Sequence, residues 1–115
     1  MTVEQNKEIA RRFIEEVWNE GRLESIDQLM SPTVANHDWP PGQTSNFEEI
    51  KQFIAGYRAK YPSLSFTIED MFGEGDEVAT RITIRGVDGI WTGIGIIRVQ
   101  DGKIVEQWAD TTRIA

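Results

Sequence analysis

The chain has 115 residues, of which 39% are hydrophobic and 27% are charged, a composition typical of a globular protein rather than a disordered one. Its formal net charge is −7 and it has no cysteine, so a polyanionic partner such as nucleic acid would be repelled, and neither a disulfide nor a thiol nucleophile is available. We expect one domain that covers residues 1–115.

Membrane and metal partners are not expected either. The apolar runs are only a few residues long, and the N-terminal residues lack the apolar core of a signal peptide, so we expect a cytoplasmic protein without membrane contact. With one histidine and no cysteine, a zinc site built from these residues is not expected. No loop shows the spacing of a carboxylate metal site, and we therefore expect no metal and no cofactor.

The N-terminal residues predict a long amphipathic helix. Thr2 and Gln5 have the spacing of a capping box, which marks a helix start. Gly21 is a natural C-terminal stop. Between them, apolar residues recur at helical spacing and form one broad stripe: Ile9, Ala10, Phe13, Ile14, Val17 and Trp18.

A short second helix, a strand and a third helix follow. The segment "LESIDQLM" (23–30) predicts a helix that Pro32 ends, and "TVANHDW" (33–39) predicts a brief strand that runs into a loop. Asn46 begins another capping box, and the third helix closes before Pro62.

The second half alternates between apolar and polar residues, which predicts strands. Four segments show the pattern: 63–72, 77–85, 90–99 and 103–112. "EGD" (74–76) predicts a turn, and the pair Asp101 and Gly102 is a strong hairpin signal. The expected fold is α+β, with three N-terminal helices packed on a curved, mainly antiparallel sheet that encloses a pocket.

Several stretches resemble the SnoaL-like polyketide cyclases, also called predicted ester cyclases, of the NTF2-like superfamily. They are "NKEIARRFIEEVWNEG", "NHDWPPG", "FEEIKQFIAGYRAKYPSLSFTIEDMFGEGDEVATRITIRG" and "IIRVQDGKIVEQW". The resemblance implies a cone-shaped α+β barrel with a deep apolar pocket, often a homodimer that forms through the sheet. It also implies aldol ring closure of a polyketide by a pocket aspartate, without metal or organic cofactor. The connection "RGVDGIWTG" is shorter than in the family, with Asp88 near the place of a usual histidine.

Asp110 and His37 are the candidate catalytic residues. In a regular strand Asp110 shares a face with Ile104, Glu106 and Trp108, and burial beside an indole would raise the pKa of a carboxyl group that acts as acid/base. The family's aspartate lies in this part of the last strand. His37 is the only histidine, and as neutral imidazole it could donate a hydrogen bond to a substrate carbonyl. The alternatives are a solvated aspartate and a loop histidine bonded to backbone.

Five further residues are candidates for substrate binding. Asp70 falls in register with an apolar strand face, so it is either a second pocket acid or a residue released by a bulge. The four tryptophans could stack against a flat ligand, with packing as the alternative: Trp18, Trp39, Trp91 and Trp108.

Two functions remain open from the sequence. The first is a cofactor-independent enzyme that performs acid/base chemistry on an apolar carbonyl compound, either polyketide-type cyclisation or isomerisation. The second is a non-catalytic, dimeric module that binds a small apolar or aromatic ligand. The fold alone does not decide between them.

Overall fold

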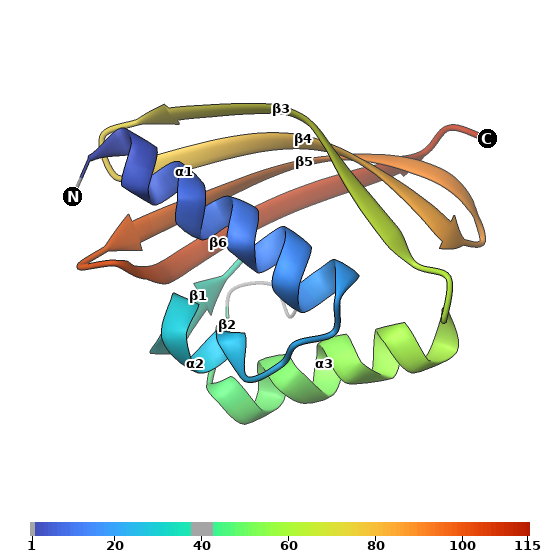
Figure 1. Ribbon diagram of the computed structural model, residues 1–115, viewed down its shortest axis with the longest axis horizontal. Coiled ribbons are helices and arrows are strands. Elements are labelled where there is room, and N and C mark those ends of the chain that lie inside the picture. The colour runs from blue at the N-terminus through green and yellow to red at the C-terminus, as the bar shows by residue number, and fades with distance from the viewer. Residues whose placement is uncertain (1, 38–42) are drawn as a thin grey trace.

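Six strands form one curved sheet, and the helical segments all lie on the same side of it (Figure 1). The structure is a computed structural model, and it describes residues 2–37 and 43–115. The strand order is β2-β1-β6-β5-β4-β3, in which only the β1–β6 pair is parallel. This arrangement confirms the α+β fold that the sequence predicts.

The elements follow the predicted order, with one additional strand. The helical segments are α1 (Val3–Arg12), the π-helix η1 (Phe13–Asn19), α2 (Ser25–Leu29) and α3 (Phe47–Lys60). The strands are β1 (Met30–Asn36), β2 (Gln43–Ser45), β3 (Ser65–Glu74), β4 (Glu77–Val87), β5 (Gly89–Gln100) and β6 (Lys103–Arg113). The sequence does not predict β2, because three residues are too short to show a periodic pattern.

Both predicted capping boxes are present. The backbone N–H of Gln5 donates to the Thr2 hydroxyl at 3.1 Å, and the Gln5 side chain accepts from the Thr2 N–H at 2.8 Å. Asn46 and Glu49 make the same reciprocal bonds at 2.9 and 3.0 Å. These bonds satisfy N–H groups that a helix leaves without partners at its start.

The first helix differs from its prediction in its second half, where η1 replaces α-helical by π-helical bonding. π-helical turns are rare and often lie at functional sites. The helix ends at Asn19, and Gly21 follows as the predicted stop, with a backbone φ of +72°. A β-carbon there would meet the Arg58 guanidinium, which donates to the carbonyl oxygens of Trp18 and Asn19.

Pro32 does not end a helix, which corrects the prediction. The second helix ends at Leu29, and Pro32 lies inside β1. Proline lacks the N–H that a strand interior needs. Pro32 is tolerated because the pairing of β1 with β6 is interrupted between Met30 and Ala35.

Strands β3 to β6 form the predicted antiparallel meander, and its last turn has the predicted geometry. Asp101 and Gly102 have φ values of +52° and +77°, the positive pair that a type I′ hairpin turn requires. Register shifts interrupt the ladders between Ile68 and Asp70 in β3, and where β6 passes from Ile104 to Glu106. Such bulges change which side chains face the helices.

The hydrophobic core lies between the helices and one end of the sheet. It contains Ile9, Phe13 and Val17 of the predicted stripe of the first helix, together with residues of α2, α3 and strands β1, β5 and β6. Its members are Ile9, Phe13, Val17, Ile26, Leu29, Met30, Val34, Ile50, Ile54, Val99 and Ile104. This core anchors η1 and α3 on the sheet but does not extend beneath all of β3 to β6.

Asn19 joins the end of η1 to β3. Its side-chain amide donates to the carbonyl oxygen of Phe66 at 2.9 Å and accepts from the Phe66 N–H at 2.7 Å, as a neighbouring strand would. The clamp holds the Trp18 ring stacked on the Phe66 ring, with centroids 4.8 Å apart and planes 15° apart.

We expect Asn19→Ala to lower the free energy of unfolding by about 1–3 kcal/mol, because it removes two hydrogen bonds and leaves backbone groups of Phe66 without partners. Urea denaturation measures the loss. Gln52→Ala, which removes only an exposed hydrogen bond on α3, is the control and should change stability by less than about 0.5 kcal/mol. Equal stability of the two variants would contradict a clamping role for Asn19.

Candidate functional site

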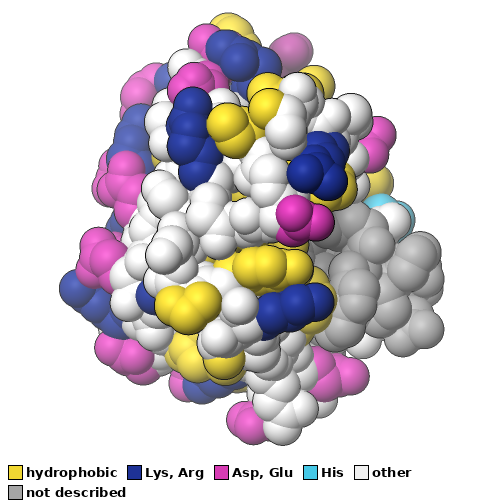
Figure 2. Space-filling view, turned by 90° about the vertical axis from the view of Figure 1, so that its right-hand side faces the viewer, with side chains coloured by type: hydrophobic (Ala, Val, Ile, Leu, Met, Phe, Trp, Pro, Cys, Tyr) yellow, Lys and Arg dark blue, Asp and Glu magenta, His cyan; other side chains and the backbone are white. Residues whose placement is uncertain are grey.

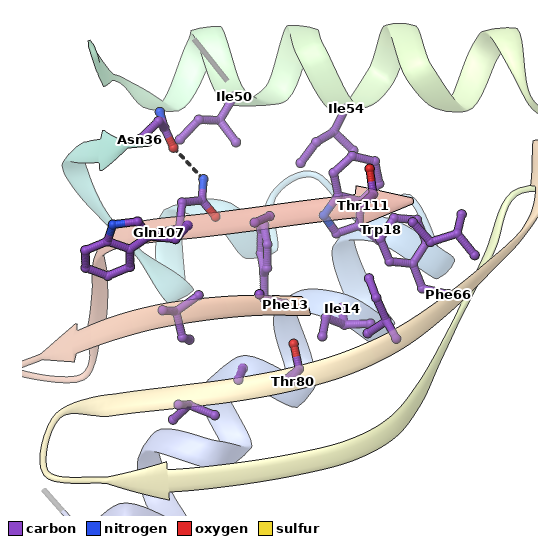
Figure 3. A pocket seen from close by; sticks show the side chains of 18 of the residues that line it. Phe13, Ile14, Trp18, Asn36, Ile50, Ile54, Phe66, Thr80, Gln107 and Thr111 are labelled. Carbon is purple, nitrogen blue, oxygen red and sulfur yellow. Dashed lines mark hydrogen bonds between the residues drawn. The ribbon is translucent and has the colours of Figure 1, made fainter. Parts of the chain in front are cut away.

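A cavity of about 260 Å³ lies between η1, α3 and the concave face of the sheet (Figure 3). It lies over the part of the concave face of the sheet that the hydrophobic core does not cover. Most of its lining is apolar. The bordering residues are Ala10, Phe13, Ile14, Trp18, Asn36, Ile50, Phe53, Ile54, Tyr57, Phe66, Val78, Thr80, Ile82, Ile84, Gly95, Ile97, Gln107, Trp108, Ala109 and Thr111.

Four aromatic rings enclose one end of the cavity. Trp18 stacks on Phe66 and meets Phe53 and Tyr57 edge-on, with centroids 6.3 and 5.9 Å away. Stacked and edge-to-face contacts are the favoured arrangements of aromatic rings, so these rings form a defined wall. Tyr57 is 37% exposed, and the cavity therefore reaches solvent beside α3.

Hydrophobic side chains gather between charged ones at the end of the molecule that carries the C-terminus (Figure 2).

A pair of amides borders the cavity away from these rings (Figure 3). The parallel pairing of β1 with β6 places Asn36 opposite Gln107. The Gln107 side-chain N–H donates to Asn36 Oδ1 at 2.6 Å, and Asn36 Nδ2 donates to the Ser45 hydroxyl at 2.5 Å. Asn36 and Ser45 are each only 2% exposed, so this relay is a buried, bonded unit.

The described residues that border the cavity include no charged side chain. Their polar side-chain groups are the two amides, the hydroxyls of Thr80, Thr111 and Tyr57, and the indole N–H groups of Trp18 and Trp108. Amides and hydroxyls orient a ligand by hydrogen bonding, while the apolar walls bury its surface. The described lining is therefore suited to binding and contains no carboxylate or imidazole that could move a proton.

A bulge in β6 explains why Asp110 is not part of this lining. The sequence-based expectation that Asp110 shares a face with Ile104 is wrong, because the strand register shifts between Ile104 and Glu106. Ile104 is fully buried in the core, whereas Asp110 is exposed and pairs with Ile94, which is 60% exposed. One extra residue reverses the faces of all that follow, so Gln107, not Glu106, faces the helices.

His37 lies in a cluster with Glu106 and Trp108. His37 Nε2 is 2.7 Å from Glu106 Oε2, and its ring stacks on Trp108 with centroids 4.7 Å apart and planes 5° apart. Arg98 Nε donates to the other Glu106 oxygen at 3.0 Å. The hydrogen bond from His37 and then that from Arg98 hold the pKa of Glu106 below its usual range. Neither His37 nor Asp110 borders the cavity, and the structure records no contact between them.

The remaining candidate residues fall in different places. Trp18 lines the cavity, and Trp108 borders it where its carbonyl oxygen lies beside Gly95. Asp70 is released by the bulge in β3 and pairs with Arg81 at 2.7 Å, which is the second of the two alternatives that the sequence leaves open. The Trp91 indole donates to the carbonyl oxygen of Asp88 at 2.8 Å, and Trp91 does not border the cavity. Trp39 lies outside the described residues.

Asn36 and Gln107 border the cavity but were not predicted as site residues from the sequence. Neutral amides carry no titration or metal-binding signature, so nothing in a single sequence distinguishes them from surface amides. The usable signal was the position of Asn36 in a predicted strand, where alternation places it on the same face as Val34. Gln107 could not be found this way, because strict alternation places it on the opposite face from Ile104.

Comparison with known families settles the relationship of the chain. The family model of the SnoaL-like domain matches residues 10–107. The chain belongs to this family. The resemblance drawn from the sequence motifs is thereby confirmed. No functionally curated protein matches this SnoaL-like chain significantly.

Solved structures share the fold of this SnoaL-like chain over almost its whole length. A candidate polyketide cyclase from Acidithiobacillus ferrooxidans is 23% identical, with a TM-score of 0.82 over 98% of this chain and 92% of its own. IdmH, a candidate polyketide cyclase from Streptomyces antibioticus, is 26% identical, with a TM-score of 0.78 over 93% and 91%. A candidate ketosteroid isomerase from Kribbella flavida is 16% identical, with a TM-score of 0.80 over 98% and 82%. Proteins described by different activities thus share this fold.

Residues 2–37 and 43–115 contain neither a membrane-spanning helix nor a cluster of metal ligands. No helix there has both the length and the apolar character needed to cross a membrane. No group of three or more histidine, aspartate or glutamate side chains in these residues has an arrangement that could hold a metal ion.

Gly95 forms part of the cavity wall, and Gly95→Ala is expected to raise the free energy of unfolding by about 0.5–1 kcal/mol. A β-carbon there would make ordinary contacts, 3.5 Å from Thr80 Oγ1 and from the Trp108 carbonyl oxygen, while alanine loses less conformational entropy on folding. Gly86→Ala is the matched comparison and should destabilise, because φ is +80° and the β-carbon would lie 1.9 Å from the Ser63 carbonyl oxygen. Urea denaturation of both variants checks the signs, and a Gly95→Ala protein less stable than wild type would contradict this geometry.

Proposed function

We propose that this SnoaL-like chain binds one small, neutral and largely apolar ring compound in the cavity between η1, α3 and the sheet. The observation that carries the proposal is the lining itself, which combines a wall of aromatic rings with a bonded amide pair and contains no charged side chain among the described residues. Apolar cavities with a few fixed polar groups are the usual form of small-molecule sites.

The volume of the cavity and the uncharged character of its described lining indicate which ligands it can hold. A dry cavity of about 150 Å³ is large enough to hold benzene, so about 260 Å³ suits a molecule of one or two rings. The described lining offers no cation to compensate an anionic ligand, and the chain carries a net charge of −7. Burial of an unpaired ligand charge would be costly, and this supports a neutral ligand.

Acid/base catalysis on a carbonyl compound is the second candidate function. Family membership and the 26% identity to IdmH, a candidate polyketide cyclase, favour it. It would assign Asp110 as acid/base and His37 as hydrogen-bond donor in a cyclisation or isomerisation. Both side chains lie away from the cavity lining, so we propose the binding function first.

A cytoplasmic location stays a prediction.

Naphthalene is a suitable neutral probe for the binding function, with affinity measured by isothermal titration calorimetry. We expect Trp18→Leu to weaken binding about 2- to 10-fold, because it removes the central ring of the aromatic wall. Asp110→Asn, which changes an exposed group outside the lining, is the control and should leave affinity unchanged. Absence of binding by the wild type would contradict the proposal. A bound cyclic ketone that the wild type converts and Asp110→Asn does not would establish the second candidate instead.

We further propose that two copies pair through the outer face of the sheet. Ile94 and Phe72 are 60% and 68% exposed on this face, which leaves large apolar groups in contact with water. A cross-strand row places Asp70, Arg81, Ile94 and Asp110 on four neighbouring strands. A two-fold axis that passes through Ile94, perpendicular to the row, would place Ile94 against its own copy and Arg81 opposite Asp110 of the other copy, so that opposite charges face each other.

We expect Ile94→Asp to shift the protein to a monomer, since it places a charge in the centre of the proposed contact. Light scattering coupled to size-exclusion chromatography measures the mass. Ile114→Asp is the matched control, because Ile114 is also 60% exposed but follows the end of β6. A monomeric wild type, or a dimeric Ile94→Asp variant, would contradict the proposed interface.

A further inference from the structure

The polarity of the amide relay leaves one acceptor at the cavity. Gln107 uses its side-chain N–H to donate to Asn36 Oδ1, and Asn36 uses its own N–H to donate to Ser45. The Gln107 carbonyl oxygen, Oε1, receives no hydrogen bond from the described residues. Figure 3 shows the Gln107 nitrogen directed at Asn36 and the oxygen on the side of Phe13.

We propose that Gln107 Oε1 determines the specificity of this cavity by selecting ligands that carry a hydroxyl or N–H donor. The inference rests on the proposed binding function and names the chemistry of its ligand: a ring compound of the phenol, alcohol or N–H heterocycle type. The ring of the ligand lies against Trp18 and Phe66, and its O–H or N–H group donates a hydrogen bond to Gln107 Oε1.

The relay opposes rotation of the Gln107 amide by itself. If the Gln107 amide rotated to offer its N–H to the ligand, Asn36 Oδ1 would lose its donor. Asn36 is 2% exposed, and a buried acceptor without a donor is strongly unfavourable. In the observed arrangement Asn36 Nδ2 donates to the buried Ser45 hydroxyl, so the relay presents the carbonyl of Gln107. Presenting the N–H instead requires both amides to turn together and the Ser45 hydroxyl to change from acceptor to donor.

A ligand without a donor would bury this carbonyl unpaired. Sites built to bond a ligand hydroxyl reject the analogue that lacks it, because their own polar group is then left without a partner. The loss of one such bond is expected to weaken binding about tenfold. A ligand with a carbonyl or ether oxygen at Gln107 would bind even more weakly, because two acceptors would then face each other.

The other polar groups of the lining do not impose this choice. The hydroxyls of Thr80 and Thr111 rotate and can either donate or accept. Tyr57 reaches solvent, where water can satisfy it. Among the acceptor groups of the lining, Gln107 Oε1 is the one whose orientation is tied to buried partners, and it is therefore the acceptor that can select a ligand donor.

The test compares 2-naphthol with 2-methoxynaphthalene, which share the ring system but differ in the donor hydrogen. Calorimetric titration of the wild type should give about tenfold tighter binding of 2-naphthol. Gln107→Met keeps a similar side-chain length without the carbonyl, and we expect the two affinities to become equal. Thr80→Val, which removes a hydroxyl from the same cavity while keeping its shape, is the matched control and should retain the preference.

The outcomes separate this inference from the binding function. If the wild type binds both compounds equally, the role of Gln107 is overturned while the binding function stands. If neither compound binds, the binding function fails and this inference fails with it. A preference that persists in Gln107→Met assigns selection to another group and overturns the inference.

A measurement on the wild type keeps the inference testable if Gln107→Met does not fold. In a ¹⁵N–¹H spectrum, the Gln107 side-chain N–H₂ signals should move on addition of 2-naphthol, because a hydrogen bond to Oε1 polarises the whole amide. They should move much less with 2-methoxynaphthalene. Equal changes with the two compounds would overturn the inference.

Discussion

The bulge in β6 is the constraint on which the chemistry of the cavity depends. Side chains of a strand alternate strictly, so the single register shift after Ile104 decides whether the rest of β6 presents amide, methyl and hydroxyl groups or charged groups to the helices. It places Gln107 beside Asn36 inside and Glu106 beside His37 outside. The same shift moves Asp110 from the interior to the outer face, where it pairs with Ile94.

Much of the fold could be predicted because it depends on local interactions. The capping boxes at Thr2 and Asn46, the stop at Gly21 and the turn at Asp101 involve residues close in sequence, and single-sequence patterns report them. The candidate site could be predicted less well. The bulges depend on strand pairing across the sheet, and the residues before and after them give no sign of the shift.

The contact of His37 with Glu106 illustrates the same limit. His37 directly follows β1, Glu106 lies on the neighbouring parallel strand β6, and the two residues are 69 positions apart, so no local spacing predicts their contact. The histidine was expected as a pocket group because histidine is chemically versatile, whereas in the structure it hydrogen-bonds to Glu106 and stacks on Trp108. Chemical versatility of a residue type indicates what it can do, and only its neighbours decide whether it does so.

The π-helical turn of η1 has a consequence for how such cavities diverge. A π-helical segment holds about one residue more than an α-helix of the same length, and one residue in an α-helix corresponds to a rotation of about 100°. Loss of one residue between Phe13 and Asn19 would turn the Trp18 ring off Phe66 while α3 and the sheet kept their places. A single insertion or deletion in this segment would therefore change the position of one cavity wall in a discrete step, while the rest of the fold stays unchanged.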